Sequence, residues 1–123
     1  MPAVAVVGAS RDRRKYGNRA VRAYLARGWT VYPINPNATE VEGLKAYRSV
    51  LEVPGPIDRV TLYVPPEIGI AVLEEIAQKG VQEVYVNPGA ESAELMRRAD
   101  ELGLRPIYAC SVLAIGMNPV QIG

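Results

Sequence analysis

The stretch "AVAVVGASRDRRKYGNRAVRAYLARG", residues 3–28, decides the fold. It begins with five apolar residues, mostly β-branched, which is typical of a strand buried on both faces. Gly8 ends this run, and four basic side chains follow within the next seven positions. Beyond them, apolar residues recur at helical spacing between Ala20 and Leu25. The stretch therefore predicts a strand, a positively charged glycine turn and a helix.

The rest of the chain continues this alternation. Residues 40–56 are less regular, with a short helix expected around 46–52, and residues 110–123 are apolar without a clear pattern. Strands alternating with helices predict a doubly wound sheet of about five mostly parallel strands with helices on both faces. Its ligand crevice lies at the C-terminal ends of the strands. Further strands are predicted at 29–34, 58–64, 82–87 and 105–109, and further helices at 67–80 and 93–103.

Composition excludes several classes of function. The 123 residues are 49% hydrophobic and 22% charged, which predicts one domain spanning residues 1–123. A net charge of +1 favours neither nucleic acid nor membrane as a partner. With no spanning segment and no leader in the sequence, we expect a cytoplasmic protein.

Two residue counts narrow the chemistry further. The chain has no histidine, which excludes a histidine general base, a Ser-His-Asp triad and a phosphohistidine intermediate. Its single cysteine, Cys110, excludes an internal disulfide and a thiol zinc site. We therefore expect no metal site.

The first glycine turn has the features of a phosphate site. Backbone amides at such a turn face an anion, and the helix N-terminus behind them favours negative charge. Ser10 adds a hydroxyl donor, and the side chains of Arg11 and Lys15 are within reach of phosphate. A solvent-exposed basic loop is the alternative, but the position at the first strand-to-helix turn favours phosphate binding.

A dinucleotide fits this turn poorly. The Gly-x-Gly-x-x-Gly fingerprint has only its first glycine here, because Ser10 and Arg13 occupy the second and third glycine positions. An NAD site also needs an acidic residue after the second strand, and residues 34–37 contain none. NAD is disfavoured, whereas NADP stays open because the arginines are suited to a 2′-phosphate. The sequence does not match a kinase-type phosphate loop, because no Gly-Lys-Ser/Thr follows the turn.

Three longer stretches resemble the small CoA-binding domain family. They are "VVGASRDRRKYGNRAVRAYLARGWTVYPINPN" (6–37), "VEGLKAYRSVLEVPGPIDRVTLYVPPE" (41–67) and "AQKGVQEVYVNPGAES" (77–92). This family is similar to the CoA-binding domain at the N-terminus of the succinyl-CoA synthetase alpha subunit. The resemblance runs from about residue 3 to about residue 110 and implies a Rossmann-like fold.

The resemblance also implies a ligand and its contacts. It implies that the chain holds coenzyme A by its 3′,5′-ADP end. Because the chain has no histidine to phosphorylate, we expect it to carry out no reaction of its own. Coenzyme A carries a pyrophosphate and a separate 3′-phosphate, which suits a loop with several cations. The implied contacts are Gly8, Ala9, Ser10, Arg11, Lys15, Tyr16, Gly17, Asn35, Pro36, Tyr63, Val64, Pro65, Pro66, Asn87, Pro88 and Gly89.

Other functions stay open at this stage. A small NADP-dependent oxidoreductase or nucleotide sensor is one alternative. A second alternative is a CoA-binding subunit for an acyl-CoA synthetase partner. We expect CoA or acyl-CoA as the small-molecule partner, and the chain could also form a homodimer.

The sequence departs from the family at two places and leaves one residue undecided. The stretch "CSVLAIGMNPVQIG" (110–123) lacks the basic C-terminal helix that is common in the family. Members often carry a lysine where Asn37 stands, and we expect Arg13 or Arg14 to replace that contact. Cys110 is expected as an inert thiol at the crevice edge, with a mixed disulfide to CoA as the alternative under oxidising conditions.

Overall fold

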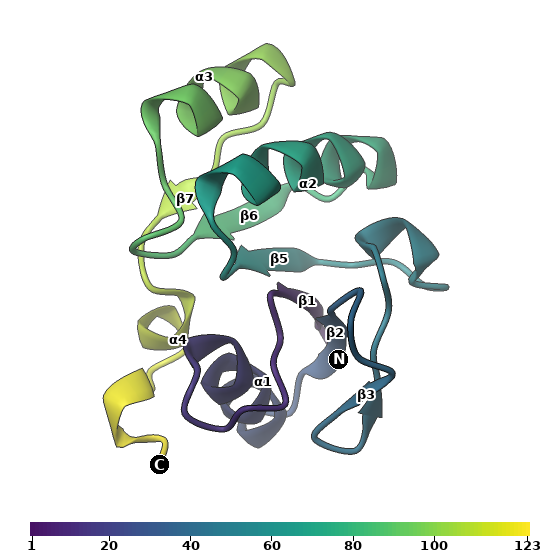
Figure 1. Cartoon of the computed structure of the whole chain (residues 1–123), viewed down its shortest axis with the longest axis vertical. Coiled ribbons are helices and arrows are strands. Elements are labelled where there is room, and N and C mark those ends of the chain that lie inside the picture. The colour runs from purple at the N-terminus through teal and green to yellow at the C-terminus, as the bar shows by residue number, and fades with distance from the viewer.

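The computed structural model describes all residues from 1 to 123 and contains one five-stranded parallel sheet (Figure 1). The strand order is β2-β1-β5-β6-β7, so the chain starts near the middle of the sheet and crosses over between neighbours. Every pairing is parallel, which confirms the Rossmann-like prediction. The strands are β1 (Ala3–Val7), β2 (Thr30–Ile34), β5 (Arg59–Leu62), β6 (Glu83–Val86) and β7 (Ile107–Tyr108).

Helices cover both faces of the sheet, as predicted. Successive strand side chains point to opposite faces, so β1 sends Ala5 and Val7 into one core and Val4 and Val6 into the other. The first core lies under α2 and α3, and the second lies under α1 and α4 (Figure 1). The helices are α1 (Tyr16–Ala26), α2 (Pro66–Lys79), α3 (Ala93–Glu101) and α4 (Ser111–Ala114).

The irregular segment after β2 is mainly a hairpin. β3 (Glu40–Val41) pairs antiparallel with β4 (Leu44–Lys45). Both residues of its turn have positive φ, 50° at Glu42 and 76° at Gly43, as two-residue hairpin turns require. The helix expected around 46–52 is reduced to one 3₁₀ turn, η1 (Val50–Glu52), in which the Leu51 amide donates to the hydroxyl of the preceding Ser49.

The C-terminal segment folds back onto α1. After β7 the chain forms α4 and then a second 3₁₀ turn, η2 (Pro119–Gln121). Arg27, which directly follows α1, donates from Nε to the carbonyl oxygen of Ile115 at 2.9 Å. The yellow end of the chain therefore lies beside α1 in Figure 1. None of the helices combines the length and the apolar character that crossing a membrane would require.

Two glycines let the start of α1 approach the sheet closely. Gly8 has φ +89°, and a Cβ there would lie 2.5 Å from the carbonyl oxygen of Tyr63. A Cβ on Gly17 would overlap with the carbonyl oxygen of Gly8. Because neither position has room for a methyl group, the first turn of α1 packs directly against the turn after β1.

Candidate functional site

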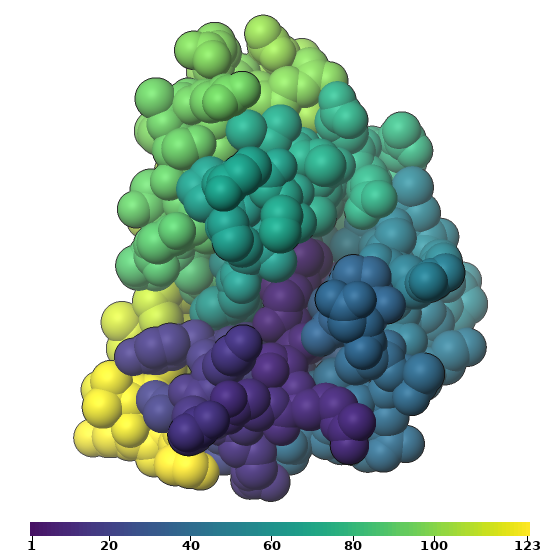
Figure 2. Space-filling view, viewed as in Figure 1, coloured from purple at the N-terminus to yellow at the C-terminus, as the bar shows by residue number.

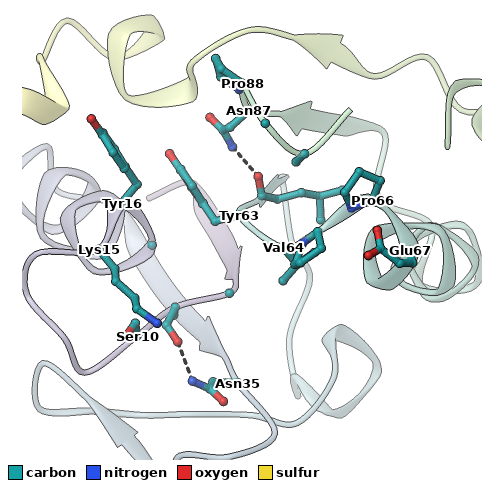
Figure 3. Close-up of a pocket in the computed structure, with 17 residues that line it drawn as sticks. Ser10, Lys15, Tyr16, Asn35, Tyr63, Val64, Pro66, Glu67, Asn87 and Pro88 are labelled. Atoms are coloured by element: carbon teal, nitrogen blue, oxygen red, sulfur yellow. Dashed lines mark hydrogen bonds between the residues drawn. The ribbon is translucent and has the colours of Figure 1, made fainter. Parts of the chain in front are cut away.

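A cleft of about 530 Å³ opens at the C-terminal edge of the sheet. The segments that follow β1, β2, β5 and β6 form its walls (Figure 3). In Figure 2 the purple N-terminal residues are recessed between the teal start of α2 and the blue residues after β2. The cleft therefore lies where the ligand crevice of an open α/β sheet is expected.

Most of the predicted contact residues meet in this cleft. All of them line it except Arg11, which is exposed, and Pro36, which is exposed beside Asn35. Three further lining residues were not predicted as contacts, namely Leu62, Glu67 and Ala90.

Backbone donors are concentrated at the turn between β1 and α1. The N–H groups of Ser10, Tyr16 and Gly17 donate no hydrogen bond within the chain. Those of Tyr16 and Gly17 belong to the first turn of α1, where no carbonyl is available four residues earlier. The three amides therefore give the cleft a set of donors suited to an anion.

Asn35 fixes the orientation of this turn. Its Nδ2 donates to the carbonyl oxygen of Ala9 at 2.8 Å, shown as a dashed line in Figure 3. A trans peptide points its N–H opposite to its carbonyl, so the N–H of Ser10 points away from Asn35. The Asn35 Oδ1 accepts from the Asn37 amide at 2.7 Å, which leaves this side chain engaged at both ends. We assign Asn35 a role in shaping the loop.

The four cations of the loop divide into two groups. Arg14 is paired with Asp12 at 3.1 Å, and Arg13 is paired with Glu42 at 3.2 Å. The side-chain hydrogen bond from Arg14 lowers the pKa of the Asp12 carboxyl to about 2. Thus both arginines that the sequence suggests as substitutes for the missing lysine have carboxylate partners.

Arg11 and Lys15 form the other group. Neither has an ion pair within the chain, and Lys15 lines the cleft. These two side chains supply the positive charge that no carboxylate of the chain neutralises directly.

A hydrogen-bond network holds the loop from behind. Asn18, fully buried in α1, donates from Nδ2 to the Ser10 carbonyl at 2.8 Å and to Glu42 Oε2 at 3.0 Å. Arg22 donates to Asn18 Oδ1 at 2.7 Å and to the Arg13 carbonyl at 2.8 Å. The β3–β4 hairpin and α1 together therefore fix the backbone that presents the free amides.

Asn87 plays a structural part on the opposite wall. Its Nδ2 donates to Thr61 Oγ1 at 2.6 Å and to the Leu62 carbonyl at 2.8 Å. Its Oδ1 accepts from the Ser111 amide at 2.9 Å, and only 3% of the residue is exposed. Both donor hydrogens are occupied, so the loop after β6 offers the cleft mainly backbone and the ring of Pro88.

Tyr63 and the start of α2 complete this wall. Burial raises the pKa of the Tyr63 hydroxyl to about 12, so the ring stays neutral at physiological pH. Pro65 and Pro66 begin α2 and place Glu67 in its first turn, at the cleft. Glu67 is the first residue of the helix that the sequence predicts at 67–80, and it was not among the predicted contacts. Its position just after a Pro-Pro helix start was the signal that could have placed it at the cleft.

A family comparison matches this architecture. The model for the CoA binding domain matches residues 2–116. The chain belongs to the CoA-binding domain family. The resemblance seen in the sequence is thereby confirmed over nearly the whole chain.

Relatives of this CoA-binding domain include large ligases. The chain is 35% identical to the alpha subunit of acetate–CoA ligase [ADP-forming] II from Pyrococcus furiosus, over 97% of this chain and 27% of that subunit. It is 36% identical to acetate–CoA ligase [ADP-forming] II from Archaeoglobus fulgidus, over 80% of this chain and 16% of the ligase. The chain thus spans about a quarter or less of these two relatives and is homologous to their CoA-binding part.

Solved structures show the same fold in chains of very different size. A conserved hypothetical protein from Pyrococcus furiosus superposes with a TM-score of 0.85 at 38% identity, covering 93% of this chain and 99% of that one. The dinucleotide-forming acetyl-coenzyme A synthetase 1 of Ca. Korarchaeum cryptofilum gives 0.75 at 36% identity, covering 87% of this chain and 26% of that one. The same fold therefore occurs both as nearly a whole chain and as part of a synthetase.

Proposed function

We propose that this CoA-binding domain holds coenzyme A in the cleft by its 3′,5′-ADP end and carries out no reaction of its own. The observation that carries the proposal is the β1–α1 turn. It presents the free amides of Ser10, Tyr16 and Gly17 beside Lys15, with no carboxylate paired to that lysine. The arrangement suits the phosphates of CoA.

The walls of the cleft suggest how the ligand lies. The phosphates would contact the free amides and Lys15, with Arg11 at the exposed side. Val64 and Pro65 on the wall after β5 offer apolar surface to the adenosine. Each charge-assisted hydrogen bond contributes roughly 1.5–3 kcal/mol. Two or three of them, with an apolar contact, are consistent with micromolar affinity, about −8 kcal/mol.

The titratable groups around the cleft support a binding role. Lys15, Tyr16, Tyr63 and Glu67 are the only ionisable side chains that line it. Tyr63 stays protonated, because burial raises the pKa of its hydroxyl to about 12. No pair among them is hydrogen-bonded as a nucleophile and base would be.

A second candidate function is favoured by one specific relative. The Pyrococcus furiosus homologue is an alpha subunit of an ADP-forming acetate–CoA ligase, of which this chain matches the CoA-binding part. The chain would then lend its CoA site to a synthetase partner. Co-purification of a ligase subunit with the tagged chain would support this function over an independent binding module.

Calorimetry at one fixed salt concentration tests the primary proposal. CoA and 3′,5′-ADP should each bind at least ten times more tightly than NAD, a difference of about 1.4 kcal/mol. NADP serves as the intermediate control, because it has a separate ribose phosphate. NAD binding as tightly as CoA would overturn the proposal, and NADP binding tightest would favour the dinucleotide alternative.

A further inference from the structure

Glu42 is the only residue other than glycine with a positive φ, at 50°. It occupies the first turn position of the β3–β4 hairpin, where asparagine, aspartate or glycine is preferred. A glutamate in this conformation is strained, and such strain persists only where surrounding contacts hold it. Although it lies at a hairpin tip, the side chain is only 19% exposed. Its carboxylate therefore has contacts that offset an unfavourable backbone.

The two carboxylate oxygens of Glu42 contact different parts of the β1–α1 turn. Oε1 accepts from Arg13 Nη1 at 3.2 Å, and Oε2 accepts from Asn18 Nδ2 at 3.0 Å. Arg13 belongs to the turn itself, whereas Asn18 holds the turn from α1 by donating to the Ser10 carbonyl at 2.8 Å. One carboxylate from a distant hairpin therefore restrains both ends of the stretch 10–13.

The side-chain amide of Asn18 has one orientation that satisfies all its neighbours. Its two Nδ2 hydrogens go to the Ser10 carbonyl and to Glu42, while its Oδ1 accepts from Arg22 Nε at 2.7 Å. A carboxylate only accepts hydrogen bonds, and a guanidinium only donates them. The reversed amide would place its oxygen against two acceptors and its NH₂ against a donor. Glu42 and Arg22 together therefore select the orientation in which Asn18 donates to Ser10.

This orientation determines where the next amide of the turn points. The carbonyl of Ser10 and the N–H of Arg11 belong to one peptide, which is trans. The N–H of Arg11 therefore points away from Asn18, and it donates no hydrogen bond within the chain. Because Asn35 orients the preceding peptide in the same way, asparagines orient two consecutive free amides, those of Ser10 and Arg11.

We propose that Glu42 is a positioning residue of the phosphate-binding turn, which its carboxylate holds in the binding conformation through Asn18 and Arg13. The assignment rests on the proposed function, because it takes this turn to bind the phosphates of CoA. A turn that is ordered before the ligand arrives loses less conformational entropy on binding. The charge of the carboxylate acts in the other direction, since it opposes an anionic ligand. Positioning and charge therefore predict effects of opposite sign when Glu42 is replaced.

The side-chain amide of Asn18 gives an NMR readout that needs no ligand. Asn18 is fully buried with both amide hydrogens bonded, whereas Asn37 is exposed and its side chain makes no hydrogen bond. In the native chain the Asn18 hydrogens should exchange with solvent much more slowly than those of Asn37. Glu42→Asn should speed their exchange by about tenfold, because one bond is lost. Exchange at Asn18 that the substitution leaves unchanged would overturn the assignment.

Calorimetry with 3′,5′-ADP tests the effect of Glu42 on binding. Asparagine adopts a positive φ readily, but it is one methylene shorter and withdraws from both contacts. At a temperature where the variant is folded, Glu42→Asn should bind 3′,5′-ADP about fivefold more weakly than the native chain. Glu40→Asn is the matched control, because Glu40 is exposed on the same hairpin, carries the same charge and has no ion pair.

The outcomes separate this assignment from the proposed function. Equal affinity of the Glu42→Asn and Glu40→Asn variants, or tighter binding by Glu42→Asn, would overturn the assignment alone. Failure of the native chain to bind 3′,5′-ADP would overturn the proposed function, and the assignment with it. If Glu42→Asn does not fold, Glu42→Gly takes its place, because glycine also accepts this backbone conformation. The same loss of about fivefold is expected for it, and native affinity would overturn the assignment.

Discussion

The two sides of the cleft differ in the chemical groups that they present to a ligand. The β1–α1 turn presents backbone amides without partners and a lysine without a carboxylate. The loops after β5 and β6 present rings, and their polar side chains are used within the fold. One side thus offers positive charge and free donors, whereas the two loops opposite offer neutral surface, with Glu67 of α2 beside them.

This difference shows that a polar side chain at the cleft is not necessarily a ligand contact. Asn18, Asn35 and Asn87 all lie at or behind the cleft, yet each is bonded to backbone or side-chain atoms of the chain. They hold loops together, whereas the groups left free are amides that no side chain supplies. A polar residue at a cleft is therefore a ligand contact only when its own hydrogen bonds are unmade.

The largest effect is expected for a substitution at the β1–α1 turn, which forms the charged side of the cleft. Gly17→Ala places a methyl group against the Gly8 carbonyl, a backbone atom that cannot move aside easily. We expect a loss of about 3 kcal/mol in unfolding free energy, and loss of CoA binding. Gly55→Ala is the control, because its Cβ would meet only the Tyr32 hydroxyl at 3.6 Å. Equal stability of the two variants in urea titrations would contradict this packing.

Asn87→Ala tests whether the neutral side is structural. The change leaves the Ser111 amide and the Leu62 carbonyl without their present partner. The unfolding free energy should fall by about 2–3 kcal/mol. At a temperature where the variant stays folded, 3′,5′-ADP affinity should change by less than threefold. Weakened binding with unchanged stability would show that the amide contacts the ligand.

Lys15→Ala tests whether the charged side binds the phosphates. We expect CoA affinity to fall by roughly 1–2 kcal/mol, with the melting temperature of the ligand-free protein nearly unchanged. Arg14→Ala is the matched control, because Arg14 is exposed and paired with Asp12. Added salt should weaken the native complex more than the Lys15→Ala complex, since one screened contact is missing. Equal CoA affinity of the Lys15→Ala and Arg14→Ala variants would show that free and paired cations do not differ in their contribution to binding.

The smallest effect concerns Tyr63 at high pH. Its pKa is about 12 in the folded chain and 10.0 in the unfolded reference, so the folded state holds the proton more tightly. The stabilisation is complete below pH 10 and is lost as pH rises toward 12, by about 1–2 kcal/mol. Tyr63→Phe should show a shallower decline over this range in denaturant titrations. Parallel curves for the two proteins would exclude Tyr63 as the cause.

Much of the fold was predictable because its signals are local. Buried strands such as Ala3–Val7 and the Pro-Pro start of α2 appear as apolar runs and helix-start residues. The β3–β4 hairpin was missed because its strands have two residues each, too few to show a period. Its turn also places Glu42 at φ 50°, a conformation that sequence alone rarely assigns to glutamate.

The candidate site was predictable by position but not by bonding. Glycine turns and strand ends indicate which residues reach the C-terminal edge. The pairing of Arg13 with Glu42 joins residues 29 positions apart, and the contact between Asn87 and Ser111 spans 24. Such pairings follow from tertiary packing, so the sequence could not show which cations and amides remain free.

NMR titration of the labelled chain with 3′,5′-ADP tests the central claim most directly, because it reports which amides meet the ligand. The account predicts the largest shift changes at Ser10, Tyr16 and Gly17, with little change at the opposite edge of the sheet around Trp29 and Arg59. Large shifts at that opposite edge, with the β1–α1 turn unaffected, would contradict it.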